Sequence, residues 1–178
     1  MGRATQAQAQ QNRQQVVAAA ARLFRERGVQ AVSVAELMAA AGLTHGGFYK
    51  QFPSKEALVA EATGQAFTEL GARLAATERD TLLDYYLSPG HRDDAGTGCP
   101  TAGLAADVAR EPADSPARAP YANGVEGFAR WLGDDGDEDL VTLSTMVGAL
   151  LLARATAGTE VSDRILAAAR ESLTTPKA

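Results

Sequence analysis

Residues 32–58 read VSVAELMAAAGLTHGGFYKQFPSKEAL, and this stretch carries the strongest structural signal in the chain. Ser33 is followed three residues later by a glutamate, which is the spacing of a helix-capping box, and apolar residues then recur three or four apart until Gly42. After this glycine turn, Thr44 can cap a second short helix that has two phenylalanines four residues apart on one face. Two short helices joined in this way are the parts of a helix-turn-helix.

The second short helix is predicted to have an apolar inner face and a polar outer face. Phe48 and Phe52 are expected to point inward as core residues, with Leu43 filling the angle between the helices. The side chains at the start of the outer face are small, so the backbone there can approach base edges. The same face carries hydroxyl groups and a lysine, which suit contacts with phosphates. It consists of Thr44, His45, Gly46, Gly47, Tyr49 and Lys50. The two adjacent glycines lower helix propensity by about 1–2 kcal/mol, which predicts a weakly formed helix.

The rest of the sequence predicts further helices and no strand, because apolar residues recur at helical spacing and no segment alternates with a period of two. Ser54 and Ser162 are placed to cap two of these helices, and the polar segment 88–98 is expected to be a mobile loop. The predicted helices span residues 16–28, 54–76, 80–87, 100–111, 122–132, 140–157 and 161–173.

Charge is distributed unevenly along the chain. The 178 residues have a formal charge of −5, but residues 1–55 carry +5 and residues 56–178 carry −10. A basic N-terminal part suits nucleic acid, since neutralising phosphates supplies most non-specific DNA affinity. Chance segregation of charge is the alternative interpretation.

Two features exclude other classes of protein. The single cysteine, Cys99, excludes an internal disulfide. The longest uncharged stretch, Leu140–Ala153, has 14 residues, whereas a transmembrane helix needs about 20. Because the N-terminus also lacks the apolar run of a signal peptide, we expect a cytoplasmic protein with no membrane partner.

The stretch quoted above resembles the DNA-binding signature of TetR-family transcriptional regulators, most specifically in FYxxF followed by SKE and an apolar pair. The resemblance implies phosphate contacts by Thr44, Tyr49 and Lys55, contact of Lys50 with a phosphate or a base edge, and base reading by His45 and the two glycines. An exposed histidine without a DNA contact is the alternative reading of His45. The implied DNA-binding residues are Ser33, Thr44, His45, Gly46, Gly47, Tyr49, Lys50 and Lys55. The glycine pair departs from the single glycine that is usual in the family.

The resemblance also implies an all-helical fold of two domains. Residues 1–55 would form the helix-turn-helix domain, with residues 1–12 as a disordered arm, and residues 56–178 a helical effector-binding and dimerisation domain. The last two helices are rich in apolar and small residues, which suits pairing with a second copy in a four-helix bundle. Packing within the core of a monomer is the alternative.

The implied function is that of a ligand-responsive regulator, a repressor that binds a palindromic operator as a homodimer on the bacterial nucleoid. A helical activator or architectural DNA-binding protein without an effector is the alternative. A small apolar effector would bind between helices of the second domain. The candidate contacts, although residues of this kind are more often plain core, are Phe67, Tyr85, Leu104, Phe128, Trp131 and Met146.

No catalytic residue, cofactor or metal ligand is expected, and the protein is not expected to be an enzyme, because two histidines and one cysteine form no nucleophile–base pair. The acidic run 134–139 lacks the glycine position and final glutamate of a calcium loop, so we expect it to favour a helix N-terminus. The spacing of His91, Asp93, Asp94 and Cys99 matches no standard metal site. A thiol at a predicted helix start leaves a redox role for Cys99 open.

Overall fold

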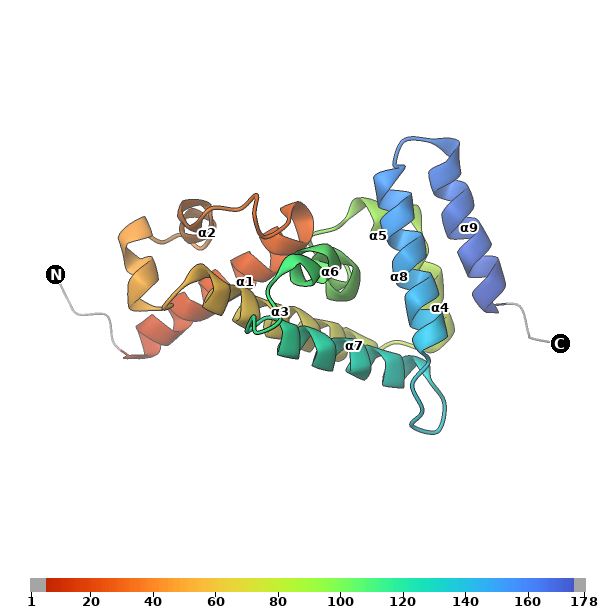
Figure 1. Cartoon of the computed structure of the whole chain (residues 1–178), viewed down its shortest axis with the longest axis horizontal. Coiled ribbons are helices and arrows are strands. Elements are labelled where there is room, and N and C mark those ends of the chain that lie inside the picture. The colour runs from red at the N-terminus through yellow and green to blue at the C-terminus, as the bar shows by residue number, and fades with distance from the viewer. Residues whose placement is uncertain (1–5, 175–178) are drawn as a thin grey trace.

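A computed structural model describes residues 6–174, and in that part of the chain every regular element is a helix (Figure 1). The elements are α1 (Gln6–Arg27), α2 (Val34–Ala40), the 3-10 helix η1 (His45–Lys50), α3 (Lys55–Leu74), α4 (Arg79–Tyr86), α5 (Pro89–Asp93), α6 (Pro100–Arg110), α7 (Arg118–Leu132), α8 (Leu140–Ala155) and α9 (Glu160–Thr174). The fold is thus the predicted all-helical one, with an N-terminal helix-turn-helix domain followed by a C-terminal helical domain.

Buried apolar side chains gather in two clusters that share α3 and α6. The first cluster joins α1, α2, η1 and the N-terminal half of α3 to Leu104 and Val108 of α6. The second joins the C-terminal half of α3 and the start of α6 to α4, α7, α8 and Leu166 of α9. In Figure 1, α3 runs from the end of the molecule that holds α1 and α2 toward α4. The domain division after residue 55 stays a prediction.

Local signals in the sequence explain several helix ends. The capping box is present, because the Ser33 hydroxyl accepts from the Glu36 amide at 3.2 Å and the Glu36 carboxylate accepts from the Ser33 amide at 2.8 Å. Gly42 ends the turn after α2 with a φ of +70°, a conformation that favours glycine. The Ser54 hydroxyl accepts from the Ala57 amide at 3.2 Å and caps α3, as predicted.

The acidic run before α8 also acts as predicted. The Asp139 carboxylate accepts from the amide of Thr142 at 2.9 Å and caps the N-terminus of α8. Acidic groups are favoured there because the exposed amides at a helix N-terminus carry partial positive charge.

The disordered arm predicted over residues 1–12 is wrong for residues 6–12, which form the first turns of α1. This segment consists of glutamine, alanine and asparagine, and glutamine and alanine have high helix propensity. Residues 6–12 continue α1, whose buried face begins at Val16. Because packing of that face already stabilises the helix, the segment needs no nucleation of its own. Residues 1–5, the rest of the predicted arm, lie outside the described residues.

The mobile loop predicted over residues 88–98 is also wrong, because α5 occupies its first half. The Ser88 hydroxyl caps α5 by accepting from the His91 amide at 3.2 Å, and Pro89 fills the first helical position, where its missing N–H costs nothing. His91 is buried, as is Cys99, the residue that follows the segment. The polar composition of this segment therefore predicted a loop where the structure has a short packed helix.

Two predicted caps are absent. Thr44 precedes η1, but its side chain makes no capping hydrogen bond. Ser162 lies inside α9, where its buried hydroxyl donates to the Ala153 carbonyl at 2.8 Å and ties α9 to α8. In addition, α7 begins at Arg118 rather than at residue 122, with Pro120 in the first turn.

Candidate functional site

The segment η1 has opposite inner and outer faces, as predicted. Phe48 is fully buried, and its ring stacks on that of Phe52 with 5.4 Å between centroids. The neighbouring Tyr49 is 72% exposed, and His45 and Lys50 are exposed as well. An apolar anchor therefore holds a polar surface toward solvent.

The predicted α-helix at this place is a 3-10 helix. Adjacent glycines lose more backbone entropy than other residues on folding, which disfavours a longer helix, whereas short 3-10 turns are common. Gly47 is where the chain approaches α2, because a Cβ atom there would lie 3.3 Å from Cε of Met38. Gly46 has open space around it, so its backbone is accessible.

Two of the predicted DNA contacts have partners within the protein. Nζ of Lys55 donates to the carbonyl of Val29 at 2.7 Å, and the Ser33 hydroxyl donates to the Glu36 carboxylate at 2.8 Å. The amide and hydroxyl of Ser33, together with Arg27, lower the pKa of Glu36 to about 2. These bonds order the starts of α2 and α3 beside η1.

The turn between α1 and α2 is also held by α6. The amide of Val29 donates to Oδ2 of Asp107 at 3.2 Å, while the carbonyl of the same residue accepts from Lys55. One peptide segment is therefore held by a side chain from α6 and a side chain from α3. The position of the helix-turn-helix depends on both helices.

A buried arginine makes a second connection between α1 and the rest of the molecule. Arg25 is 6% exposed, and its Nη2 donates to Oε2 of Glu69 on α3 at 3.3 Å. Burial lowers its pKa. The helix α6 packs directly against it, because a Cβ atom on Gly103 would lie 3.0 Å from Cγ of Arg25.

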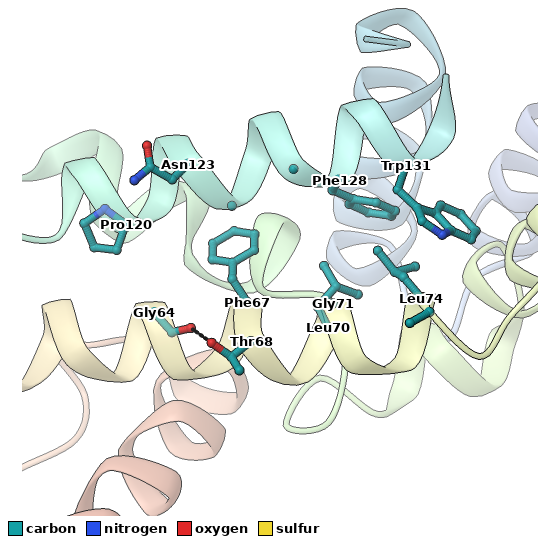
Figure 2. A pocket seen from close by; sticks show the side chains of 13 residues that line it. Gly64, Phe67, Thr68, Leu70, Gly71, Leu74, Pro120, Asn123, Phe128 and Trp131 are labelled. Atoms are coloured by element: carbon teal, nitrogen blue, oxygen red, sulfur yellow. Dashed lines mark hydrogen bonds between the residues drawn. The ribbon is translucent and has the colours of Figure 1, made fainter. Parts of the chain in front are cut away.

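An open groove of about 530 Å³ lies between α3 and α7, and we call it the α3–α7 groove (Figure 2). Three of the six predicted effector contacts, Phe67, Phe128 and Trp131, line it. Figure 2 shows the Phe67 ring rising from α3 toward α7. The helices approach each other at Gly124, where a Cβ atom would lie 2.2 Å from the Phe67 ring.

A second space, of about 480 Å³, lies where α3 ends and α4 and α5 begin, and we call it the α3–α4 cavity. Tyr85 is the predicted effector contact that lines it. The other lining residues are Leu70, Arg73, Leu74, Ala76, Thr77, Thr81, Leu82, Tyr86, His91 and Cys99. The predicted effector contacts are therefore divided between two separate spaces.

His91 closes one side of the α3–α4 cavity in a defined tautomer. Its Nε2 accepts from the amide of Cys99 at 3.1 Å, so its Nδ1 carries the proton and donates to the carbonyl of Tyr86 at 2.9 Å. Burial lowers the pKa of His91 to about 4, and neighbouring Arg154 acts in the same direction. The ring is neutral near pH 7, and neither nitrogen is available to a metal ion.

For the two remaining residues, Leu104 and Met146, contact with an effector stays a prediction. Leu104 is packed in the first core cluster and Met146 in the second, and neither lines the groove or the cavity. Helical spacing shows that a side chain is buried but not whether it borders a space. Tyr86 and His91, which line the α3–α4 cavity, were not among the predicted contacts, although the adjacent tyrosines were a weak signal.

An exposed polar face on an apolar anchor, preceded by a capped helix and a glycine turn, defines a helix-turn-helix protein. The profile of bacterial regulatory proteins of the tetR family matches residues 16–62. The uncharacterized HTH-type transcriptional regulator Rv0196 of Mycobacterium tuberculosis is 30% identical over 163 aligned positions, which cover 80% of this chain and 84% of that protein. The chain belongs to the TetR family of DNA-binding transcriptional regulators.

Solved structures show that the whole fold is shared. A TetR transcriptional regulator from Chloroflexus aurantiacus superposes with a TM-score of 0.68 at 24% identity, over 94% of this chain and 96% of that chain. A TetR-family regulator from Agrobacterium tumefaciens gives a TM-score of 0.70 at 19% identity, over 92% and 98% of the two chains. At these identities the likeness concerns the fold.

Two further features characterise residues 6–174. No helix there has the length and apolar character that crossing a membrane requires. In the same range, histidine, cysteine and carboxylate side chains form no group of three or more that could hold a metal ion.

Proposed function

We propose that the protein is a ligand-responsive repressor that binds a palindromic DNA operator as a homodimer and thereby associates with the nucleoid. The observation that carries this proposal is the exposed polar face of η1, held on the buried Phe48. Its outer side presents an imidazole, a phenol, an ammonium group and an open stretch of backbone within a single short segment. These are groups that contact base edges and phosphates.

The residues of this face have different roles in the proposal. His45 and the accessible backbone at Gly46 approach base edges, while Thr44, Tyr49 and Lys50 contact phosphates. Ser33 and Lys55 lie at the first turns of α2 and α3. Their internal bonds orient these helix N-termini, whose free amide groups are suited to binding phosphate.

A homodimer follows from the small size of the recognition segment, because one short segment cannot supply both affinity and site length. Two copies placed about 34 Å apart read successive major grooves on one side of the duplex. The outer face of α8 suits such pairing, since Val141 is 69% and Leu152 is 58% exposed. Val161 at the start of the adjacent α9 is exposed as well.

Ligand binding changes operator affinity in this proposal by moving α3 and α6. Both helices border the second core cluster, and both hold the Val29 turn through Lys55 and Asp107. A small displacement of either helix alters the spacing of two helix-turn-helix units in a dimer. The coupling free energy between two such sites is typically about 1–3 kcal/mol.

Selection of binding sites from random duplex DNA, followed by anisotropy titrations at two salt concentrations, tests DNA recognition. We expect an inverted repeat to be enriched. Lys50→Ala should weaken binding and lower the salt slope by about one, because one phosphate contact is lost. Arg130→Ala is the control, since this exposed arginine of α7 pairs with Glu126. Failure to enrich any sequence would contradict the proposal.

The dimer is tested by sedimentation of the double variant Val141→Glu and Leu152→Glu. Like charges on a face that meets its own copy should separate the protomers and abolish operator binding. A wild-type protein that sediments as a monomer, and that binds one half-site, would contradict the homodimer.

A further inference from the structure

We propose that the α3–α4 cavity binds an uncharged, mainly apolar molecule that carries a hydrogen-bond acceptor, and that the Tyr86 hydroxyl donates to this acceptor. The inference rests on the proposed ligand-responsive function. It identifies the cavity, the chemical class of the ligand and the side chain that recognises it.

The Tyr86 hydroxyl is a buried polar group without an oxygen or nitrogen partner for a hydrogen bond. The residue is 2% exposed and lines the cavity, and its hydroxyl has no partner in the described protein other than the weakly hydrogen-bonding thiol of Cys99. Buried polar groups are rarely left unpaired, and ligand pockets place a small number of them among apolar side chains. Contacts of its ring with His91, 4.6 Å between centroids, and with Phe128, 6.2 Å, hold the hydroxyl in place.

The hydroxyl is suited to act as a donor. Burial, followed by the nearby Cys99 thiol, raises the pKa of Tyr86 well above its usual range, so the phenol keeps its proton. The His91 ring is already bonded through both nitrogens, as described above. The ligand must therefore bring the acceptor.

The charges around the cavity disfavour a charged ligand. None of the lining residues is acidic, so a buried cation would find no counter-charge. The single ionic lining residue is Arg73, which is exposed and donates to the carbonyl of Thr97 at 2.6 Å. His91 is neutral near pH 7, and nearby Arg154, like Arg73, already donates to backbone carbonyls, so a buried anion would compete with these bonds for a cationic partner.

The remaining lining favours an apolar body of moderate size. Leu70, Leu74 and Leu82 are buried around the cavity, whose volume of about 480 Å³ suits a small molecule. The α3–α7 groove offers a different environment, since its Thr68 hydroxyl already donates to the carbonyl of Gly64 at 2.9 Å (Figure 2).

Competition among three naphthalenes tests the assignment. The fluorescent ketone 6-propionyl-2-dimethylaminonaphthalene serves as the reporter, and it is displaced by 2-acetonaphthone, 2-ethylnaphthalene or 2-naphthoate. These competitors share one ring system and differ in having a neutral acceptor, no acceptor or a charged one. Wild type is compared with Tyr86→Phe and with the control Tyr121→Phe, whose hydroxyl donates to the carbonyl of Thr101 and which lines neither the cavity nor the groove.

We expect wild type to bind 2-acetonaphthone most tightly and 2-naphthoate most weakly. Tyr86→Phe should lower affinity for the ketone by about two- to tenfold, which is the range for one neutral hydrogen bond. It should leave the affinity for 2-ethylnaphthalene unchanged, and Tyr121→Phe should change neither affinity. The inference is overturned if Tyr86→Phe keeps full ketone affinity, if 2-naphthoate binds most tightly, or if no naphthalene binds to wild type.

Two plugging variants test the location. Thr77→Phe fills the α3–α4 cavity and should abolish reporter binding, whereas Gly127→Leu enters open space in the α3–α7 groove and should retain it. The reverse result would overturn the assignment. Because Tyr86→Phe removes a group without an oxygen or nitrogen partner, its melting temperature should equal or exceed that of wild type.

Binding and regulation are measured separately. The naphthalene titrations contain no DNA, and operator affinity is then measured with and without 2-acetonaphthone. Ketone binding that depends on Tyr86 but leaves operator affinity unchanged would support the cavity assignment and contradict ligand responsiveness.

Discussion

The two ends of this molecule differ in how fully their polar groups are bonded within the protein. At the helix-turn-helix end, polar groups around η1 are bonded inside the protein, including Ser33 to Glu36 and Lys55 to Val29. At the other end, the α3–α4 cavity leaves about 480 Å³ unfilled and the Tyr86 hydroxyl without an oxygen or nitrogen partner. This difference indicates that one end is ordered in the absence of DNA, whereas the other has the unfilled space in which we propose that a ligand binds.

The helices that join the two ends explain how such different regions can act together. Both α3 and α6 contribute residues to both core clusters, so each helix has one part in each of the two regions. The comparison is therefore tested by substitutions that affect one region alone and by substitutions that remove contacts between the two regions.

The largest expected effect concerns the anchor of the recognition segment. Phe48→Ala should lower the free energy of unfolding by about 3–5 kcal/mol, because it removes a fully buried ring. The neighbouring Tyr49→Ala should change stability by less than about 0.5 kcal/mol and yet weaken operator binding, since its ring is 72% exposed. Urea unfolding and operator anisotropy check the pair. Equal losses of stability would contradict the assignment of inner and outer faces.

The next effect concerns the approach of α3 and α7. Gly124→Ala should destabilise the protein by about 1–3 kcal/mol, because a Cβ atom would lie 2.2 Å from the Phe67 ring. Gly127→Ala on the same helix has open space and should stabilise by up to about 1 kcal/mol through helix propensity. Thermal unfolding of both variants measures the difference. A stabilising Gly124→Ala would show that the groove is wider than described.

The buried histidine should make the C-terminal end sensitive to acid. The pKa of His91 is lowered from 6.5 to about 4, so at pH 5 the unfolded chain binds a proton that the folded protein does not. The free energy of unfolding should therefore fall between pH 7 and pH 5, by on the order of 1–2 kcal/mol from this group.

Urea titrations at both pH values check this expectation. His91→Gln should reduce the pH dependence, while His45→Gln, a change at an exposed histidine of η1, should leave it as in wild type. An unaltered dependence in His91→Gln would mean that His91 is not the responsible group.

The smallest effect concerns the contact between α6 and the Val29 turn. Asp107→Ala should cost about 1 kcal/mol of stability, because one hydrogen bond to a backbone amide is lost. It should also weaken the effect of a ligand on operator affinity. The matched control is Asp114→Ala, at an exposed loop position. If a ligand changes the operator affinity of Asp107→Ala as much as that of wild type, then α6 does not connect the ligand site to the helix-turn-helix.

The helix-turn-helix could be predicted in detail because its signals are local. The spacing of Ser33 and Glu36, the glycine at residue 42 and the phenylalanine pair each fix a feature within a few residues. The 3-10 form of η1 was not predicted, since the glycines indicated weakness but not which geometry would replace the α-helix.

The candidate effector site could be predicted only in part. Sequence periodicity identified buried side chains, but Leu104 and Met146 lie in the core clusters, and Phe67 and Tyr85 border different spaces. Whether neighbouring helices leave a cavity depends on packing between residues far apart in the sequence. The burial of His91 likewise depends on α5, which polar composition concealed.

The most direct test of the central claim is the ratio of affinities for the selected operator and for a scrambled duplex of equal length. It is measured at one salt concentration for wild type and for His45→Ala. Specific binding by the outer face of η1 predicts a ratio of at least about 1,000 for wild type, because specific sites exceed non-specific DNA by this margin. The same face predicts a lower ratio for His45→Ala, with non-specific affinity retained. A wild-type ratio near one would contradict the account.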